Sequence, residues 1–375
     1  MSGKHSFAQR LLAWYDRHGR KALPWKQGRD PYRIWVSEIM LQQTQVATVI
    51  PYYERFMQRF PDMRALARAP LDTVLERWAG LGYYARARNL HHCARRIVDD
   101  HRGRFPRDME AVAGLPGIGP STAAAILAFA FGKRHPILDG NVKRVLARYH
   151  AIEEPIGARA TETRLWALAA RHTPERRVAA YTQAIMDLGA TVCRRSNPDC
   201  KACPVAPGCR ARRLGRQSDF PKRSATRVRP VRATVMLMLC DRAGRVLLEK
   251  RPPAGIWGGL WSLPELAHDD DLRAVCHARF GCDALIGKPW PAVTHDFTHF
   301  RLVITPQPLM ARAPIARAME DNGVFWHKPG LKRMGLPAPV QLLLKRLHDG
   351  KNGELREARP RSRRARHAGV PRRTR

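Results

Sequence analysis

Four cysteines in the middle of the chain are spaced closely enough to hold one metal centre. Cys193, Cys200, Cys203 and Cys209 lie within seventeen residues, separated by six, two and five positions. Proline, glycine and asparagine lie between them, so this loop can wrap around a metal. Four thiolates suit tetrahedral zinc as well as an iron–sulfur cubane. Zinc ribbons usually pair two Cys-x2-Cys knuckles across a long spacer, and this loop has one, so we expect a [4Fe-4S] cluster.

A carboxylate, Glu38, interrupts the otherwise apolar run at residues 34–41. Apolar side chains on both faces of the expected helix would desolvate this carboxyl group and raise its pKa. A glutamate with a raised pKa can act as a general acid at neutral pH. A lone glutamate usually lies on a solvated helix face, but this neighbourhood offers little solvated face. We therefore predict a catalytic carboxyl at Glu38.

Two glycines, Gly117 and Gly119, lie in the string LPGIGPST directly before an apolar helix. Without Cβ atoms they let backbone amides approach a phosphate at the N-terminus of that helix. Proline at the first helical position also fits an ordinary helix start, so a plain tight turn between two helices is the alternative. The motif indicates phosphate binding only in combination with other signals.

These motifs together resemble the MutY family of adenine DNA glycosylases, in the endonuclease III superfamily. The cysteine spacing is similar to the cluster loop of that family, LPGIGPST to its helix-hairpin-helix, and WVSEIMLQQTQV (residues 35–46) to its active-site helix. The resemblance covers roughly residues 5–348. It implies an enzyme that flips adenine out of duplex DNA and removes it where it is mispaired with 8-oxoguanine or guanine, in base-excision repair.

The resemblance also implies catalytic roles. Glu38 would protonate the purine and then assist water, and Asp139, one helix after the hairpin, would stabilise or trap the sugar cation. Asp139 and Asn141 also precede the helical run at residues 142–149, where either residue is a typical N-cap. The two residues can divide these jobs, and we include both in the predicted catalytic group.

Further positions match DNA-contacting residues of the family. Gln42 and Gln43 would reach into the DNA, and GLGYYARAR (residues 80–88) resembles a wedge loop in which Tyr83 enters the base stack and Arg86 lies nearby. Aromatics beside glycine otherwise belong most often to a core. The hairpin contributes the remaining expected contacts, which are Gly117, Gly119 and Ser121.

Ser121 occupies the position at which the lyase branch of the superfamily carries its Schiff-base lysine. Without an amine there, the protein is expected to hydrolyse the glycosidic bond largely without cutting the strand.

The sequence WGGLWSLPE (residues 257–265), followed by a helix, resembles a Nudix domain. A working Nudix helix needs clustered glutamates to hold Mg²⁺, and residues 274–281 contain no acid. The resemblance therefore implies a binding domain. In the MutY family a Phe-Ser-His loop contacts the oxidised guanine, and the matching lesion-recognition residues here are Phe297, Thr298 and His299, with threonine in place of serine.

The elements that must position these residues can be predicted in outline. Amphipathic helices at residues 7–15, 71–78 and 122–131 predict an all-α catalytic region over residues 1–192, followed by the cluster loop at 193–209. Two aliphatic runs, 233–240 and 245–250, flank the turn sequence DRAG and predict a hairpin. That hairpin opens an α+β Nudix-like domain over residues 233–348. A basic linker at 210–232 and a basic tail at 349–375, expected to be disordered, complete the expected multidomain organisation.

The charge of the chain points to a polyanionic partner. Lysine and arginine number 67 against 32 acidic residues, a formal net charge of +35. A membrane surface is the alternative, but the longest apolar run, residues 123–131, is too short to span a bilayer, and the first residues lack an apolar signal core. We expect a soluble cytoplasmic monomer, nucleoid-associated if bacterial, that acts on double-stranded DNA without membrane contact.

Three alternatives remain open. An endonuclease III-like pyrimidine glycosylase with lyase activity is opposed by Ser121 and by the second domain. A nucleotide-pool pyrophosphatase is opposed by the missing glutamates. A noncatalytic iron–sulfur DNA-binding or redox protein predicts that Glu38 and Asp139 are dispensable.

Overall fold

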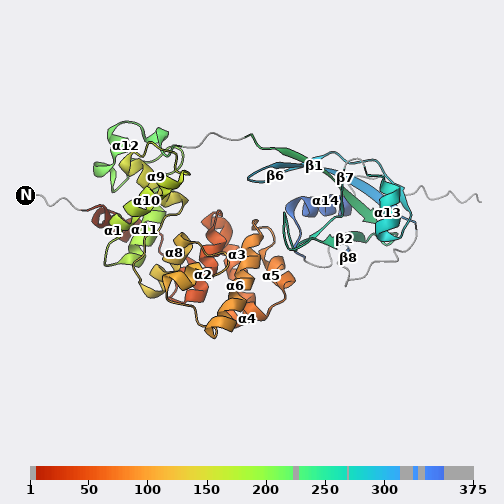
Figure 1. Ribbon diagram of the computed structural model, residues 1–375, viewed down its shortest axis with the longest axis horizontal. Coiled ribbons are helices and arrows are strands. Elements are labelled where there is room, and N and C mark those ends of the chain that lie inside the picture. The colour runs from red at the N-terminus through yellow and green to blue at the C-terminus, as the bar shows by residue number, and fades with distance from the viewer. Residues whose placement is uncertain (1–5, 223–227, 268–269, 313–323, 328–333, 350–375) are drawn as a thin grey trace, which may run out of the picture. The chain divides into compact units, whose positions relative to one another are not determined.

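The computed structural model of the chain describes residues 6–222, 228–267, 270–312, 324–327 and 334–349, with side chains left out at 324–327. Two compact units are present (Figure 1): Met1–Val228 with Pro252–Leu260, and Arg229–Arg251 with Trp261–Arg375. The basic tail expected from the sequence lies, beyond Asp349, outside the described residues. No helix in the described ranges is both long and apolar enough to cross a membrane.

Within its described residues the first unit is helical, as predicted. The helices expected at residues 7–15, 71–78 and 122–131 are all present. In chain order the α-helices are α1 (Phe7–His18), α2 (Pro31–Leu41), α3 (Val46–Arg59), α4 (Met63–Arg68), α5 (Leu71–Trp78), α6 (Ala85–His101), α7 (Met109–Ala113), α8 (Pro120–Phe131), α9 (Gly140–His150), α10 (Arg159–His172), α11 (Val178–Asp187) and α12 (Arg210–Arg213).

Local capping explains where several of these helices begin. Ser6 and Gln9 form a capping box at α1, and the Asp30 side chain accepts a hydrogen bond from the Tyr32 amide at the start of α2, where Pro31 is the first helical residue. Asp139 caps α9 in the same way. Short polar side chains followed by proline or an apolar run therefore set the positions of the helices that carry the site.

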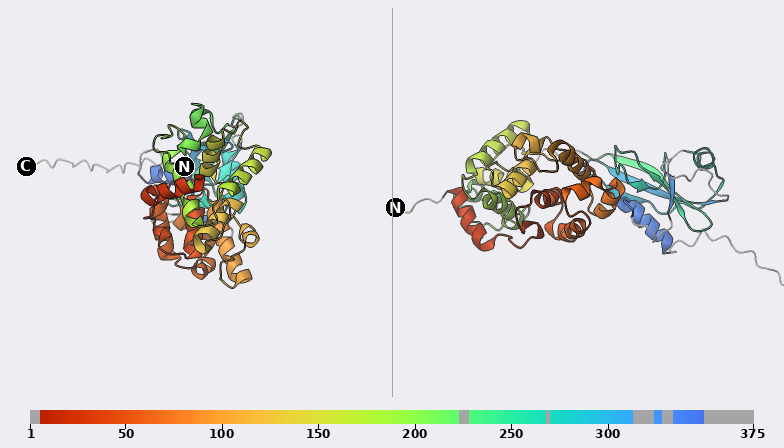
Figure 2. Two further views of the ribbon diagram at one scale, coloured as in Figure 1. Left: turned by 90° about the vertical axis from the view of Figure 1, so that its left-hand side faces the viewer. Right: turned by 90° about the horizontal axis from the view of Figure 1, so that it is seen from below.

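The helices around α9 share an apolar core. Buried side chains of α1, α9, α10 and α11 pack together, including Leu11, Leu146, Leu165 and Tyr181. Helix α1 lies beside α11, although the two are far apart in the sequence (Figure 2). Each fully buried aliphatic or aromatic side chain contributes roughly 1.5–3 kcal/mol. This packing brings the first helix of the chain up against the helices that surround Asp139.

Residues 210–222 differ from the linker expected from the sequence. They form α12 and a short 3-10 turn at Gln217–Asp219. The buried guanidinium of Arg148, on α9, donates through Nε to the carbonyl oxygens of Gln217 and Phe220, both at 3.0 Å. This part of the basic stretch is folded against α9, because a buried arginine recruits carbonyl acceptors from it.

The second unit is built on one mixed sheet (Figure 1). Strand β1 pairs in parallel with β7, from Val231 opposite Arg301 to Cys240 opposite Met310, and the other pairings are antiparallel. The described elements are β1 (Val231–Cys240), β2 (Val246–Lys250), β3 (Trp261–Ser262), β4 (Glu265–Leu266), α13 (Leu272–Phe280), β5 (Ala284–Ile286), β6 (Val293–Asp296), β7 (Arg301–Ala311), β8 (Val324–His327) and α14 (Ala338–His348).

The predicted hairpin and the mixed α/β character of this unit are confirmed. The Asp241 amide donates to the Arg245 carbonyl at 2.9 Å, and Gly244 takes the left-handed conformation at φ 76° that closes the turn. Helix α13 packs Cys276 and Phe280 against buried strand residues such as Leu237 and Leu309. Helix α14 lies beside the strands (Figure 2).

Candidate active site

A cavity of about 780 Å³ opens where α2, α8, α9 and α11 meet in the first unit. Its volume is in the range of pockets that hold small organic groups. The cavity brings together most of the catalytic and DNA-directed residues expected in this unit, although they are separated by as many as a hundred positions. Those lining it are Glu38, Gln42, Gln43, Ser121, Asp139 and Asn141.

Glu38 lies in the second half of α2, between Ser37 and Ile39, which are both buried. The pKa of its carboxyl is raised to about 8, mainly by burial and also by the negative charge of Asp139, while Lys26 opposes the shift. At neutral pH the carboxyl therefore carries a proton that it can donate. The side chain is half-buried and also lines a second cavity of about 280 Å³, to which Lys26 and Tyr15 contribute.

Asp139 takes the N-cap role that the sequence left open for it, and it also lines the cavity. One carboxylate oxygen accepts a hydrogen bond from the Val142 amide at 2.7 Å, which caps α9, and the other accepts from Asn141 Nδ2 at 3.3 Å. Burial raises the pKa of this carboxyl, while the two hydrogen bonds oppose the shift because they favour the charged form. The cap also fixes the side chain at the edge of the cavity.

Asn141 does not cap α9 but supports the residue that does. Its amide nitrogen donates to Asp139, and its side-chain oxygen accepts from Arg144 Nη2 at 2.8 Å. Arg144 also donates to the carbonyl oxygens of Gly189 at 2.7 Å and Cys193 at 2.8 Å. Asp139 is thus connected through two side chains to the backbone of the first cysteine in the loop.

Several residues of the cavity wall carry no local sequence signal. Arg20 and Gln183 both line the cavity. Both donate to the carboxylate of Asp187, Arg20 Nη2 at 2.7 Å and Gln183 Nε2 at 2.8 Å, and Asp187 is almost fully buried. Arg20 and Asp187 are 167 positions apart, so only the tertiary packing of α1 on α11 reveals this arrangement.

Two loops near the cavity hold the residues expected to enter DNA. Gln43 and Tyr83 both have left-handed backbones, at φ 56° and 47°, and the Tyr83 side chain is 52 % exposed. Non-glycine residues adopt this conformation uncommonly. Gln42 Nε2 donates to Thr122 Oγ1 at 3.3 Å, which joins its loop to the start of α8.

The hairpin glycines have different structural reasons for being glycine. Gly117 has φ 77°, and a Cβ atom there would lie 2.8 Å from the Cβ of Asn89. Gly119 precedes the first residue of α8, and a Cβ atom there would meet nothing within 4 Å. The exposed side of Gly119 leaves the N-terminus of α8 open to an anion. Beside it, Ser121 Oγ accepts a hydrogen bond from the Leu138 amide at 3.2 Å.

Arg86, which the sequence places among the DNA-contacting residues, is buried. The residue is 8 % exposed, and its guanidinium donates to backbone carbonyl oxygens of Ile39, Met40 and Gln42. Burial lowers the pKa of this guanidinium to about 10, so it stays charged at neutral pH. We revise the expectation, because the charge faces the protein interior and is not presented to a phosphate.

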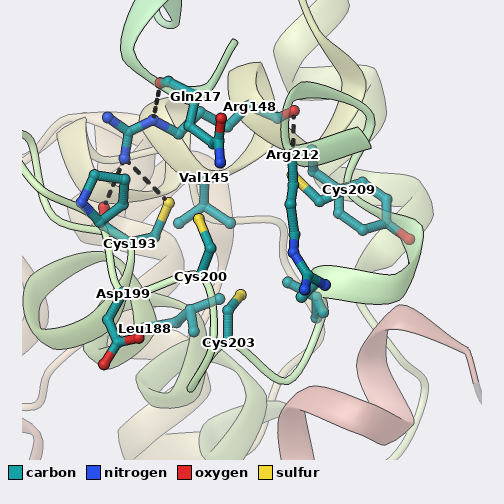
Figure 3. Close-up of a pocket in the computed structure, with 14 residues that line it drawn as sticks. Val145, Arg148, Leu188, Cys193, Asp199, Cys200, Cys203, Cys209, Arg212 and Gln217 are labelled. Atoms are coloured by element: carbon teal, nitrogen blue, oxygen red, sulfur yellow. Dashed lines mark hydrogen bonds between the residues drawn. The ribbon is translucent and has the colours of Figure 1, made fainter. Parts of the chain in front are cut away.

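The four cysteines of the loop line a third, smaller cavity (Figure 3), together with Val145, Arg148 and Leu188 from the flanking helices. Arg148 Nη1 donates to Cys193 Sγ at 3.4 Å, and Cys209 Sγ donates to the Arg148 carbonyl at 3.5 Å. The four cysteines of the loop therefore face one cavity, and helix α9 contacts two of these cysteines, Cys193 and Cys209.

The cysteine cavity has the donor chemistry for a thiolate-ligated metal group. Burial raises the pKa of the Cys203 and Cys209 thiols, in Cys203 to about 12, so metal binding must displace their protons. The cavity wall also includes the arginines Arg148 and Arg212, whose positive charges suit an anionic cluster. In the described part of the chain, no group of three or more His, Cys, Asp or Glu side chains forms a ready-made site for a single metal ion.

In the second unit, the residues expected to recognise a lesion form the turn between β6 and β7. The Phe297 amide donates to the Phe300 carbonyl at 2.9 Å, and their rings stack at 4.5 Å. Thr298 and His299, between them, are exposed. The stacked rings hold the turn, and the His299 imidazole lies edge-on to the Phe300 ring at 4.8 Å.

Sequence comparisons agree with this architecture. Residues 36–171 match the HhH-GPD superfamily of base excision DNA repair proteins, and residues 234–346 match the NUDIX domain. A solved thermostable thymine-DNA glycosylase is 28 % identical, with a TM-score of 0.50 over 56 % of this chain and 95 % of its own. The helical fold is that of a helix-hairpin-helix DNA glycosylase, so the protein belongs to this class of base excision repair enzymes.

Relatives that extend through both units narrow the class. The adenine DNA glycosylase of Buchnera aphidicola subsp. Baizongia pistaciae is 36 % identical over 345 residues, which cover 91 % of this chain and 96 % of that protein. The adenine DNA glycosylase of Homo sapiens is 34 % identical over 359 residues, which cover 79 % of this chain and 65 % of that protein. The chain belongs to the adenine DNA glycosylase (MutY) family.

Proposed function

We propose that this enzyme removes adenine mispaired with 8-oxoguanine or guanine from duplex DNA, as a step of base-excision repair. Relatives that match most of this chain are named adenine DNA glycosylases. The observation that carries the proposal is the pair of carboxyl groups in one cavity, Glu38 from α2 and Asp139 from the start of α9. Two carboxyl groups with different environments are what acid-assisted cleavage of a glycosidic bond requires.

The reaction breaks the bond between N9 of adenine and C1′ of deoxyribose. Glu38 donates its proton to the purine, so the bonding electron pair leaves with a neutral adenine. The sugar is left as an oxocarbenium ion, and the Asp139 carboxylate stabilises or traps it. The Glu38 carboxylate then accepts a proton from the attacking water, which restores the acid and places a hydroxyl on C1′.

The neighbouring residues of the cavity would position the flipped nucleotide. Arg20 and Gln183 can donate hydrogen bonds to the base edge, and Asp187 holds both side chains in place. Gln42, Gln43 and Tyr83 would fill the space vacated in the duplex, as the family resemblance implies. Backbone amides at Gly117 and Gly119 would bind a phosphate.

We infer that the enzyme largely lacks lyase activity. Ser121, at the position of the lyase amine, has a hydroxyl that accepts a hydrogen bond from Leu138. A hydroxyl cannot form the imine that precedes strand cleavage. The amine of Lys143, on the same helix as Asn141, forms an ion pair with Glu162 at 2.6 Å.

We assign a [4Fe-4S] cluster to Cys193, Cys200, Cys203 and Cys209. The support is their shared cavity, the arginines in its wall and the spacing typical of the family. When bound, the cluster supplies a structural anchor for a basic loop and not a reacting group. Arg148 and Arg144 of α9 would hold the loop backbone against the helix that begins at Asp139.

We propose that the second unit recognises the oxidised guanine through Phe297, Thr298 and His299. Helix α13 occupies the position of the catalytic Nudix helix and carries no acidic residue between Leu272 and Phe280, so it lacks ligands for Mg²⁺. The exposed hydroxyl and imidazole of the β6–β7 turn are hydrogen-bonding groups suited to a modified base edge.

One assay tests the central proposal. Purified protein is incubated with duplexes that contain adenine opposite 8-oxoguanine, guanine or thymine, and alkali then converts each abasic site to a strand break. Breaks are expected at the mispaired adenines and are expected only after alkali. Glu38→Gln and Asp139→Asn should abolish them. Absence of any break at adenine contradicts the proposal, and full activity of either variant removes that residue from the mechanism.

The monomeric state and the metal are tested separately. Light scattering should give the mass of a single chain for the free protein, and the mass of one chain plus one duplex after a duplex with one site is added. Iron and sulfide analysis should give four of each per chain, whereas zinc in their place would contradict the cluster assignment.

A further inference from the structure

A buried guanidinium joins two loops that face the proposed DNA site. Arg86 lies in the first turn of α6, and 8 % of its surface is exposed. Burying an arginine is costly unless its donors find acceptors. Here the acceptors come from two separate segments of backbone, and each segment carries a residue expected to enter the base stack.

The first segment follows the helix of Glu38. Arg86 Nη1 donates to the carbonyl oxygens of Ile39 at 3.0 Å, Met40 at 2.8 Å and Gln42 at 2.6 Å, and Nη2 donates to Thr44 Oγ1 at 3.1 Å. Carbonyls in the last turn of a helix lack helical partners and carry partial negative charge. Arg86 therefore closes the C-terminus of α2 and fixes the turn that holds Gln43.

The second segment is the loop between α5 and α6. Arg86 Nη2 donates to the carbonyl oxygens of Leu81 at 3.3 Å and Gly82 at 3.2 Å. The guanidinium also lies 5.3 Å from the Trp78 ring centre and 5.5 Å from that of Tyr83. A cation over an aromatic face is attracted to it. One side chain thus holds both the backbone of this loop and the ring at its tip.

Both segments contain a backbone conformation that needs support. Gln43 and Tyr83 are left-handed, at φ 56° and 47°. Such conformations persist at non-glycine residues when the surrounding structure over-determines them, and they cluster at functional sites. Arg86 contacts the residues on both sides of Gln43 and the two residues before Tyr83, so it is the group that these two conformations share.

We propose that Arg86 is a positioning residue that locks the Gln42–Gln43 turn and the Tyr83 loop into one rigid unit, so that their side chains enter the duplex together and displace a paired adenine. This inference rests on the proposed glycosylase function. Arginine is required because its planar fork reaches both segments at once, whereas a lysine ammonium is a single point that can serve one of them.

The test compares a paired adenine with an adenine that is already unpaired. Single-turnover release is measured on a duplex with adenine opposite guanine and on the same duplex with adenine in a one-base bulge. Arg86→Met should slow release from the paired site by about 100-fold and from the bulge by less than about fivefold, since the lost hydrogen bonds act before chemistry. Arg86→Lys should fall between Arg86→Met and the wild type.

Control variants separate a loss of loop positioning from a general loss of folding or activity. Arg95→Met removes an exposed arginine from the same helix and should leave both rates unchanged. If Arg86→Met does not fold, Thr44→Val removes one of the contacts and should still slow the paired site more than the bulge. The proposal is overturned if the folded variant with the largest effect releases adenine from the paired site and from the bulge with equal slowing. Wild-type protein that releases adenine from neither substrate overturns the proposed function instead.

A second readout is independent of catalysis. Amide hydrogen exchange in the free protein should speed up at residues 42–45 and 80–84 together in Arg86→Lys, while exchange in α9 stays unchanged. Faster exchange in one segment alone contradicts the claim that one side chain couples the two.

Discussion

The carboxyl group of Glu38 is held uncharged in the folded protein, and this has a consequence for stability. Its pKa is raised from 4.5 to about 8, so the folded state binds a proton that the unfolded state releases above pH 4.5. The stabilising contribution of this group is complete below pH 4.5 and is lost as the pH rises through about 8. The proton needed for catalysis is thus retained at the expense of stability.

Glu38→Gln should therefore stabilise the protein at alkaline pH. The amide is neutral at every pH, so the variant should exceed the wild type by on the order of 2 kcal/mol at pH 8.5 and match it near pH 4.5. Urea unfolding at the two pH values measures this difference. Glu54→Gln, on the exposed face of α3, is the matched control. A Glu38→Gln variant less stable than the wild type at pH 8.5 would show that the carboxyl is not desolvated.

In the proposed mechanism, the same carboxyl sets the alkaline limb of the pH–rate profile. Values of kcat/KM report the free enzyme, so they should fall as the pH rises through about 8, where Glu38 loses its proton. The slope should approach tenfold per pH unit. Constant kcat/KM between pH 7 and 10 would exclude Glu38 as the proton donor. An adenine analogue with an electron-withdrawing substituent leaves more readily without a proton, so its release should depend least on pH.

At the scale of elements, local signals were enough to predict several parts of the site. Glu38 inside an apolar helix, the glycine hairpin before α8 and Asp139 before α9 each depend on residues within a few positions. Cap and turn chemistry act at that range, so a single sequence reveals them. Strands β1 and β2 were predictable for the same reason, since their turn sequence specifies the pairing.

The parts that were not predicted depend on long-range packing. Arg20 meets Asp187 across 167 positions, and Arg86 reaches carbonyls more than forty positions away. An arginine on an amphipathic helix looks the same in the sequence whether its head binds a phosphate or buried carbonyls. Resemblance to a family identified the loop around Arg86 but could not distinguish these two uses, and the buried contacts do.

Helices α9 and α10 also meet through a histidine pair that is absent from the motifs. His150 Nε2 and His172 Nε2 lie 2.9 Å apart, so one ring donates to the other. The pKa of each ring is lowered to about 4, mainly by burial. In His150 the charges of His172 and Arg171 add to this effect, and in His172 the charge of Arg171 does. Both rings are therefore neutral in the folded protein at pH values where a free histidine is charged.

This pair should make the helical unit sensitive to acid. Between pH 6.5 and about 4 the unfolded chain takes up protons that the folded pair refuses, so stability falls as the pH falls. Between pH 7.5 and 5, the wild type should lose on the order of 1 kcal/mol more than His172→Phe, after allowance for solvent screening of half-buried rings. Thermal unfolding at both pH values measures this. Equal losses in the two proteins would contradict it, and His277→Phe, in α13 of the other unit, is the control.

At the scale of the whole molecule, basic charge is distributed far beyond the catalytic cavity. The net charge is +35, and the last twenty-six residues, 350–375, carry ten basic and two acidic side chains. The site chemistry uses few of these charges, since Arg20, Arg86 and Arg148 are directed to acceptors within the first unit. Phosphates attract basic proteins regardless of base sequence, so a net charge of this size favours nonspecific binding to DNA.

Deleting residues 350–375 should therefore weaken nonspecific binding to DNA and leave the rate of adenine release unchanged. Each phosphate contact that the tail makes contributes about 0.9 to the slope of log affinity against log salt, so the truncated chain should show a shallower slope on duplexes without a mispair. Its single-turnover release of adenine at saturating protein should equal that of the full chain, because Glu38 and Asp139 lie in the first unit. A chain of the same length with the tail arginines changed to glutamine separates charge from length. An unchanged salt slope would show that the tail makes no phosphate contact. Slower release of adenine at saturating protein would show that the tail contributes to the cleavage step.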